Sequence, residues 1–202
     1  WENGVLQGNE FYKNESLLNG KYYSQTGELL STISQGSGKQ FFLCKDQCIH
    51  ELEYCHGIAE GCVHEYNNKN ELIHTYHQKG GEKDGKELIY YPKSKKKLLC
   101  IHWKEGKIHG ISNTWYLNGK MESQREFSEN MKNGLSLAWY EDGELMMIED
   151  YEKDKLKKGE YFEKGSKQPI SRIIEGNGYA TLFDLKGQFL TRIQYENSVP
   201  QQ

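Results

Sequence analysis

Cysteines and histidines gather in one stretch of the sequence, and these side chains bind metals or form disulfides. The stretch contains Cys44, Cys48, His50, Cys55, His56, Cys62 and His64. A structural zinc site needs four such ligands in a tetrahedral arrangement. The cysteines are separated by three, six and six residues, and none of these spacings is the tight pair of a zinc knuckle. We therefore expect packed or unpaired thiols, with no metal and no cofactor.

Other residues with catalytic potential lack the surroundings that catalysis needs. His56 and His109 each precede a glycine, which predicts a turn. Glu149 and Asp150 are adjacent carboxylates, but general acid–base catalysis requires a pocket that shifts their pKa values. No serine or cysteine lies at a spacing from a base that would suggest an activated nucleophile. We expect no catalytic residues and a protein that is not an enzyme.

A basic segment follows Pro92 and is the strongest candidate for binding anions. It carries Lys93, Lys95, Lys96 and Lys97. Such a run could contact acidic lipid headgroups at a membrane surface or a phosphate backbone. The chain as a whole has a formal net charge of −3, which argues against general nucleic-acid binding. The alternative is a solvated hairpin tip with no ligand.

The composition limits the class of protein and leaves its compartment open. Aromatic residues make up 12% of the chain, too many for a disordered segment. No apolar run reaches 18 residues, so no transmembrane helix is expected. No signal peptide is visible, although a chain that starts with Trp1 leaves room for a removed leader. Five cysteines, an odd number, favour the cytoplasm slightly over export.

The elements that position these residues follow from a repeat of 24 residues. Gly110 and Gly134 are 24 apart, as are three further pairs of positions. The further pairs are Trp115 with Trp139, Tyr116 with Tyr140, and Gly119 with Gly143. Less regular copies start at Gly20, Gly38, Gly61, Gly85, Gly159 and Gly178, and the copies at Gly20 and Gly159 are shortened. A period of this length indicates a repeat array.

Each copy reads as a β-hairpin. Residues 111–116 and 135–140 alternate between two faces, which is typical of strands. Asn118-Gly119 and Asp142-Gly143 accept the positive φ angles of tight hairpin turns. Short strands joined by tight turns predict an antiparallel meander. We expect an all-β fold with little helix, built as an elongated, twisted meander of tandem hairpins.

The repeat also predicts one array over residues 1–202. Residues 1–19 would be a degenerate N-terminal cap, residues 20–195 about seven hairpin repeats, and residues 196–202 a tail. In this register Cys48 takes the place of an inward-facing leucine, whereas Cys55 follows Tyr54 and should face the other way. Ligands on opposite faces cannot share a metal. A disulfide between Cys55 and Cys62 stays open if the protein is exported.

The two regular copies resemble a known family of repeats. GKIHGISNTWYLNGKM at residues 106–121 and KNGLSLAWYEDGEL at residues 132–145 are similar to the variant MORN repeat of bacteria. Residues 174–178, with Phe183 and Gly187, resemble the last repeat of such proteins. The resemblance covers residues 20–195 and implies a hairpin scaffold with no catalytic residues. Bacterial members are described as YwqK-family antitoxins, and MORN repeats more broadly are linked to scaffolding and membrane association.

The aromatic pairs give the expected binding surface. Trp103, Trp115, Trp139, Tyr90, Tyr66 and Phe183 should form the buried spine of the repeats. Their neighbours Tyr91, Tyr116 and Tyr140 would then line an exposed groove, and tyrosine is a preferred anchor in protein interfaces. We expect a non-catalytic scaffold that binds another protein, with antitoxin-like neutralisation of that partner as one version of the role. The alternative is a membrane-associated scaffold that uses the lysine segment. The partner and the oligomeric state do not follow from the sequence.

Overall fold

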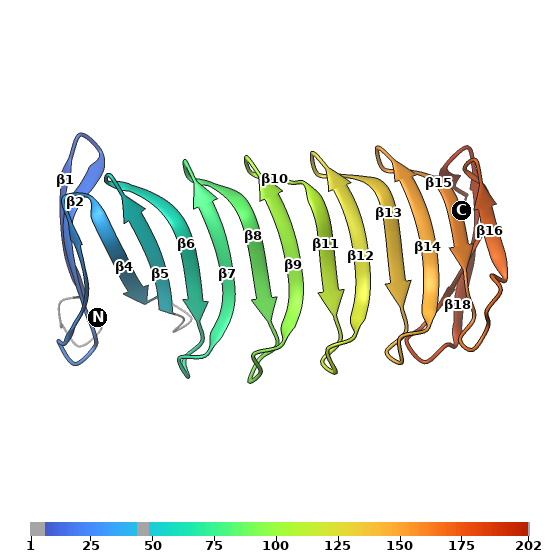
Figure 1. Cartoon of the computed structure of the whole chain (residues 1–202), viewed down its shortest axis with the longest axis horizontal. Coiled ribbons are helices and arrows are strands. Elements are labelled where there is room, and N and C mark those ends of the chain that lie inside the picture. Colours follow the sequence, from blue (N-terminus) through green and yellow to red (C-terminus); the bar gives the residue numbers. More distant parts are fainter. Residues whose placement is uncertain (1–6, 44–48, 202) are drawn as a thin grey trace. The chain divides into compact units, whose positions relative to one another are not determined.

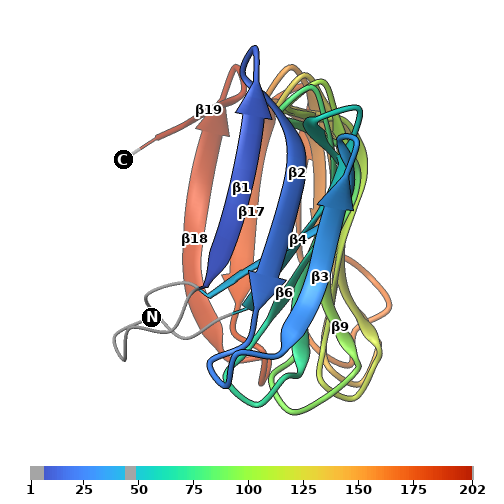
Figure 2. The same cartoon turned by 90° about the vertical axis from the view of Figure 1, so that its left-hand side faces the viewer.

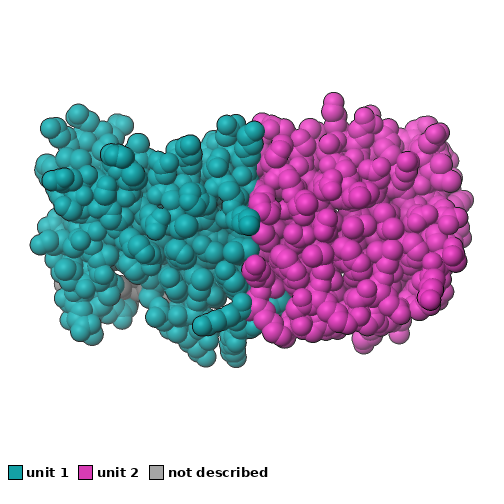
Figure 3. All heavy atoms as spheres, in the orientation of Figure 1, with its two compact units in different colours: residues 1–95, 103–106 teal, residues 96–102, 107–202 magenta. Residues whose placement is uncertain are grey.

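The computed structural model describes residues 7–43 and 49–201, which form nineteen strands and no helix. The prediction of an all-β antiparallel meander is therefore confirmed. The chain divides into two compact units, coloured separately in Figure 3. The first unit comprises residues 1–95 and 103–106, and the second comprises residues 96–102 and 107–202.

Strands fill both units in chain order. The first unit contains β1 (Gly8–Lys13), β2 (Ser16–Tyr23), β3 (Leu29–Ser34), β4 (Ser37–Leu43), β5 (Ile49–Cys55), β6 (Ile58–Tyr66), β7 (Leu72–Lys79) and β8 (Glu82–Tyr90). β9 (Lys97–Lys104) has residues in both units. The second unit continues with β10 (Lys107–Ile108), β11 (Gly110–Trp115), β12 (Met121–Ser128), β13 (Met131–Trp139), β14 (Leu145–Glu152), β15 (Lys155–Tyr161), β16 (Ser171–Ile174), β17 (Asn177–Phe183), β18 (Phe189–Glu196) and β19 (Val199–Pro200). Figure 1 shows neighbouring strands running in opposite directions.

The repeated residues of the sequence turn out to be partners across each hairpin. Trp139 lies opposite Leu145 where β13 pairs with β14, and Gly134 lies opposite Tyr151. The same pairings recur where β17 meets β18, with Phe183 opposite Phe189 and Gly178 opposite Tyr195. Cross-strand contacts of this kind are the unit of sheet stabilisation, and an aromatic ring opposite a glycine covers the bare backbone. The 24-residue pattern therefore reflects the register of the strands.

The regular hairpins close with a three-residue loop whose last residue has a positive φ. That residue is glycine in the β11–β12 and β13–β14 hairpins, whereas Asn70 takes the positive φ between β6 and β7 and Lys93 takes it between β8 and β9. In the β11–β12 hairpin, the Gly119 N–H donates to the Tyr116 carbonyl at 2.8 Å, and Gly119 has a φ of +91°. Asn118 does not have a positive φ, and its side-chain oxygen accepts the Lys120 N–H at 2.8 Å. This geometry is a type I turn followed by a left-handed residue. The asparagine therefore serves as a side-chain acceptor, and the positive φ that the dipeptide was expected to accept falls on Gly119 alone.

Successive hairpins are joined by two-residue turns in which both residues have positive φ. The pairs are Asn14-Glu15, Gln35-Gly36, His56-Gly57, Gly80-Gly81, Glu105-Gly106, Glu129-Asn130, Lys153-Asp154, Glu175-Gly176 and Asn197-Ser198. Two consecutive left-handed residues define the type I′ turn, whose twist matches that of the flanking strands. Several of these pairs lack glycine, so the residue types alone do not indicate a left-handed turn there.

Hydrogen bonds pass between these two-residue turns and the preceding hairpin. The Asp154 N–H donates to the Lys132 carbonyl at 2.9 Å, and the Lys132 N–H donates to the Asp154 side chain at 2.7 Å. Asn130 makes the same pair of bonds with Ile108, at 3.0 and 2.8 Å. These two turns thus bond to backbone just after the preceding turn, which fixes the register of the hairpins that they join.

The chain contains the same five-strand arrangement twice, once in each unit. We call β1–β5 the first module and β14–β18 the second module, and Figure 2 shows β1, β2, β3 and β4 of the first. Glu10 lies opposite Gly20 in the first module, as Glu149 lies opposite Gly159 in the second. Both modules then have a short β-ladder of two pairs, which joins β3 to β4 and β16 to β17.

The two hydrophobic cores lie in these modules. Leu17, Tyr22 and Ile33 form the core of the first module, and Leu156, Tyr161, Ile173 and Ala180 form that of the second. The two copies that look shortened in the sequence therefore mark the best-packed parts of each unit. Residues 1–19 were expected to be a degenerate cap, yet residues 8–13 and 16–19 lie in β1 and β2.

Gly178 should be the least replaceable glycine of the second module. Its φ is +134°, and a β-carbon there would lie 2.2 Å from the Arg172 carbonyl oxygen. We expect Gly178→Ala to reduce the free energy of unfolding by about 3 kcal/mol, because backbone strain and a backbone clash add. Gly119→Ala is the control: its φ is +91° but nothing lies within 4 Å. Urea unfolding of both variants tests this, and equal losses would contradict the predicted clash.

Candidate interaction surface

The tyrosines expected in an exposed groove lie mainly inside the protein. Tyr140 is 0% exposed and Tyr116 is 7% exposed, whereas Tyr91 is half-buried. The Tyr140 hydroxyl donates to the Phe162 carbonyl at 2.9 Å, and the Tyr116 hydroxyl donates to the Trp139 carbonyl at 2.6 Å. The expected exposure of Tyr116 and Tyr140 is therefore wrong. Each tyrosine is the first residue after the strand that leads into the loop of its own hairpin. Its hydroxyl donates to a backbone carbonyl of the next hairpin.

The expected aromatic spine is only partly buried. Phe183 is buried, whereas Trp103, Trp115, Trp139, Tyr90 and Tyr66 are half-buried. In the two most regular repeats, the second aromatic of the pair is the deeper one. Burying a phenol requires a hydrogen-bond acceptor, and the next hairpin supplies it through its backbone.

The lysine segment is exposed at Lys93, Lys95, Lys96 and Lys97. The Lys96 ammonium donates to the Leu117 carbonyl at 2.8 Å, so this lysine already forms a hydrogen bond within the second unit. Binding of these lysines to a membrane surface stays a prediction.

The cysteine cluster is described in part. Cys55 is exposed, Cys62 is half-buried and Cys100 is buried, and Cys55 and Cys62 are free thiols. Cys44 and Cys48 lie outside the described residues, so predictions about them are not addressed. Within residues 7–43 and 49–201, no group of three or more histidine, cysteine or acidic side chains could hold a metal. Burial raises the pKa of the Cys62 thiol, with a further contribution from Glu53.

Both histidines that precede glycines are exposed, but only His56 lies in a turn, and the turn predicted at His109 is wrong because His109 lies between β10 and β11. His56 is the first residue of the two-residue turn between β5 and β6, with a φ of +51°. Its Nδ1 atom lies 3.1 Å from the Cys55 sulfur. His109 donates its backbone N–H to the His102 carbonyl at 2.9 Å.

Each module contains a carboxylate that accepts two tyrosine hydroxyls. Glu149 accepts Tyr161 at 2.8 Å and Tyr151 at 3.0 Å. Glu10 accepts Tyr22 at 2.9 Å and Tyr12 at 3.0 Å, which is the equivalent set in the first module. Burial raises the pKa of both Tyr161 and Tyr22, and the neighbouring carboxylate raises it further. These phenols stay protonated and act as structural donors.

A longer polar network crosses the middle strands of the first unit. The His74 ring lies between two carboxylates, with Nδ1 2.9 Å from Glu65 and Nε2 2.7 Å from Glu87. Glu87 is buried and also accepts the Trp103 indole N–H at 2.6 Å and the Lys83 ammonium. Burial alone would raise the pKa of Glu87, but hydrogen bonds from Lys83, His74 and Trp103 outweigh it and lower the pKa. The network therefore holds a charged carboxylate inside the sheet.

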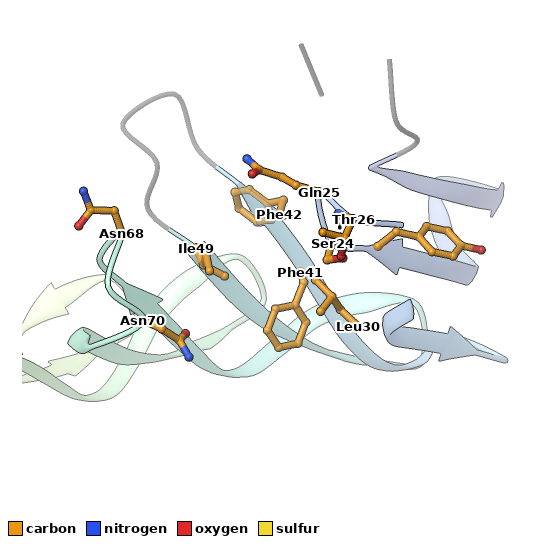
Figure 4. Close-up of a pocket in the computed structure, with 10 residues that line it drawn as sticks. Ser24, Gln25, Thr26, Leu30, Phe41, Phe42, Ile49, Asn68 and Asn70 are labelled. Atoms are coloured by element: carbon orange, nitrogen blue, oxygen red, sulfur yellow. Dashed lines mark hydrogen bonds between the residues drawn. The ribbon is translucent and has the colours of Figure 1, made fainter. Parts of the chain in front are cut away.

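One cleft of the first unit has a volume of about 670 Å³, and Figure 4 shows its lining. Leu30, Phe41, Phe42 and Ile49 supply its apolar surface, with amides and hydroxyls from Ser24, Gln25, Thr26, Asn68 and Asn70. Among the described residues that line it, Tyr23 is the single titratable one. This lining offers contacts to a ligand but no acid–base pair.

The second unit has a shallow groove of about 430 Å³ that combines apolar and charged side chains. Leu135, Ile148 and Ile174 supply the apolar part, and Leu135 and Ile174 are 44% and 65% exposed. Asp150, Lys158, Glu160 and Arg172 supply the charges, and Arg172 Nε lies 3.1 Å from Glu160. These residues come from four neighbouring strands, β13–β16, as the register of those strands requires.

The sequence analysis missed this groove, although part of the signal was present. Leu135 directly follows the repeat glycine Gly134, and Ile111 holds the same place in the previous copy. Both are exposed and lie on the strand face of Trp115 and Trp139, which was expected to be the inward face, so that assignment is inverted. Ile174 and Arg172 belong to the shortened copy, where the repeat register is lost in the sequence.

Tyr140→Phe should test the bond between hairpins. The hydroxyl is buried, so its loss leaves the Phe162 carbonyl without that donor. We expect the free energy of unfolding to fall by about 1–2 kcal/mol. Tyr179→Phe is the control, because its hydroxyl is exposed and 3.5 Å from its acceptor. A loss for Tyr140→Phe no larger than for the control would show that the bond adds nothing.

Glu87→Gln should test the charged network. Replacing a buried carboxylate that faces Lys83 and His74 leaves these donors without their charged acceptor, and we expect a loss of about 3–5 kcal/mol at pH 7. Because folding lowers the pKa of Glu87, its contribution is present above the unfolded value of about 4.3 and is lost as the pH falls below it.

The gap in stability between wild type and Glu87→Gln should therefore narrow between pH 7 and pH 3.5 in urea unfolding. Glu105→Gln, at an exposed turn position, is the control and should cost little. A gap that stays constant over this pH range would rule out a charged Glu87 as the source of the stability.

Comparisons with protein-family models and with curated proteins found no match for this chain.

Proposed function

We propose that this chain is a non-catalytic repeat scaffold of MORN-like hairpins that binds another protein. The groove over β13–β16 carries this proposal. It exposes two large aliphatic side chains, Leu135 and Ile174, next to Arg172. Apolar contacts with arginine among them are typical of protein interfaces.

The chemistry of the groove fits a protein surface better than a small metabolite. Its charges alternate in sign across neighbouring strands, with Asp150 opposite Lys158 and Glu160 opposite Arg172. A partner with complementary charges could exchange ion pairs with these residues around an apolar centre. Neutralisation of a toxic partner would be one form of this function.

The use of the buried polar groups also supports a role without catalysis. Glu149 accepts two tyrosine hydroxyls, and Glu87 accepts donors from His74, Lys83 and Trp103. A general base needs free access to a substrate proton. These carboxylates instead face donors from their own unit, which suits a structural role.

Photo-crosslinking at the groove tests the proposal. A benzophenone amino acid at position 135 or 174 should capture the same partner protein, identified by mass spectrometry. Arg172→Glu should lower that yield about tenfold, because it places like charges together. Position 185 is the control, since Leu185 is 53% exposed but lies outside the groove. Equal capture from position 185, or none from 135 and 174, would refute the groove as the binding surface.

A further inference from the structure

The first residue of the hairpin loop differs between repeats. Tyr116 and Tyr140 hold this place after β11 and β13, and each donates its backbone N–H to the carbonyl four residues further on, at 2.9 and 2.8 Å. Asn67 makes the same bond after β6, where its N–H donates to the Glu71 carbonyl at 3.0 Å. Asn67 is therefore equivalent to the two tyrosines, with a short side chain in place of a ring.

The asparagine side chain bonds within its own loop, whereas the tyrosines reach the next hairpin. The Asn67 Oδ1 atom accepts the N–H groups of Lys69 and Glu71 at 2.9 and 3.0 Å, and its Nδ2 atom lies 2.8 Å from the Glu71 carboxylate. The Tyr116 hydroxyl instead donates to the Trp139 carbonyl of the following hairpin. The polar atoms of Asn67 thus serve the β6–β7 loop alone.

A cleft of about 680 Å³ lies at the place that a tyrosine would bridge, between the loops that follow β6 and β8. Figure 1 shows both loops at the same end of their hairpins. Tyr66, Leu72 and Tyr90 supply the apolar part of this Tyr66–Tyr90 cleft. Its other lining residues are Asn70, Glu71, Lys93, Ser94 and Lys95. Tyr90 holds the place of Trp139, because each lies five residues after its repeat glycine, so the cleft adjoins the residue whose carbonyl is equivalent to the acceptor of Tyr116.

The charged side chains of the cleft favour an anionic group beside the ring. Lys93 and Lys95 are exposed on the loop after β8. Glu71 also lines the cleft, but its carboxylate accepts the Asn67 amide. Two ammonium groups therefore face one carboxylate that already has a donor, which complements an acidic ligand.

We propose that the Tyr66–Tyr90 cleft binds a tyrosine side chain of a partner protein, next to an acidic residue of the same segment. The bound ring takes the place that Tyr116 and Tyr140 fill in their own repeats, and its hydroxyl donates to the Tyr90 carbonyl. Tyrosine combines a large apolar ring with a polar tip, which suits a cleft with these two kinds of lining. This site deepens the proposed scaffold function and rests on it.

A peptide that carries the chain's own bridging tyrosine tests the proposal. The probe spans residues 138–143 with Trp139→Ser, so that an acidic pair follows the tyrosine, and it carries a fluorescent label. We expect it to bind the full chain. A peptide with phenylalanine in place of the tyrosine should bind about fivefold more weakly, because it lacks the hydroxyl donor. A peptide with alanine there should not bind.

Two variants of the protein test the location. Asn67→Tyr should weaken binding of the probe about tenfold or more, because the new ring fills the cleft from within. Lys69→Tyr is the control, since it places a tyrosine in the same loop at an exposed position that does not line the cleft, and it should bind normally. Lys95→Glu, also at an exposed position, should weaken binding about tenfold through like charges. Circular dichroism checks that each variant is folded.

Chemical shifts should move at residues 66–72 and 90–95 and stay unchanged at positions 135 and 148. Equal binding of the alanine peptide, or normal binding to folded Asn67→Tyr, would overturn the proposal. So would self-association of the chain that Asn67→Tyr abolishes, because the occupant would then belong to a second copy. Crosslinking at positions 135 and 174 concerns the second unit, so a failed peptide experiment leaves the groove proposal standing and a failed crosslink leaves the peptide result readable.

Discussion

The backbone hydrogen bond that passes from a two-residue turn to the preceding hairpin is the interaction on which both units depend. Ladder bonds fix two strands of one hairpin, but successive hairpins also need a common register. The bond from Asp154 to Lys132 and its equivalent from Asn130 to Ile108 supply that register. The turns approach so closely that a β-carbon on Gly176 would lie 2.4 Å from the Ser198 hydroxyl. These two-residue turns have positive φ with or without glycine, as type I′ geometry requires.

The repeat of the sequence predicted the meander because its regular spacing encodes cross-strand partners. An aromatic and the leucine or methionine six residues later face each other, as Trp115 and Met121 do. The turns at Glu129-Asn130 and Lys153-Asp154 could not be predicted in the same way. Their left-handed backbone follows from the two-residue connection between paired strands, which the residue types at these positions do not mark.

The same limit applies to the candidate site. Tyr116 and Tyr140 look like surface anchors in a strand pattern, but each finds an acceptor one repeat further on. The pattern gives alternation along a strand and says nothing about a carbonyl 22 or 23 residues away. Likewise the groove joins the regular copies to a shortened copy, where periodicity no longer assigns faces. The phenol–carboxylate sets of Glu10 and Glu149 became visible only through their geometry.

The two modules have equivalent strand pairing and equivalent buried hydrogen bonds. The modules share the register of their first two strands and the short ladders that join β3 to β4 and β16 to β17. They also share the tyrosine–glutamate set, and they differ at one place. That difference is the strand beside β5, which β18 has only in part.

Residue-resolved hydrogen exchange tests this equivalence most directly. We predict slow exchange for the amides of residues 50–53 in β5, and fast exchange for alternate amides of residues 190–193 in β18, beside which the described residues 7–43 and 49–201 supply no second partner strand. Equal protection of the two segments in the isolated protein would contradict the difference between the modules.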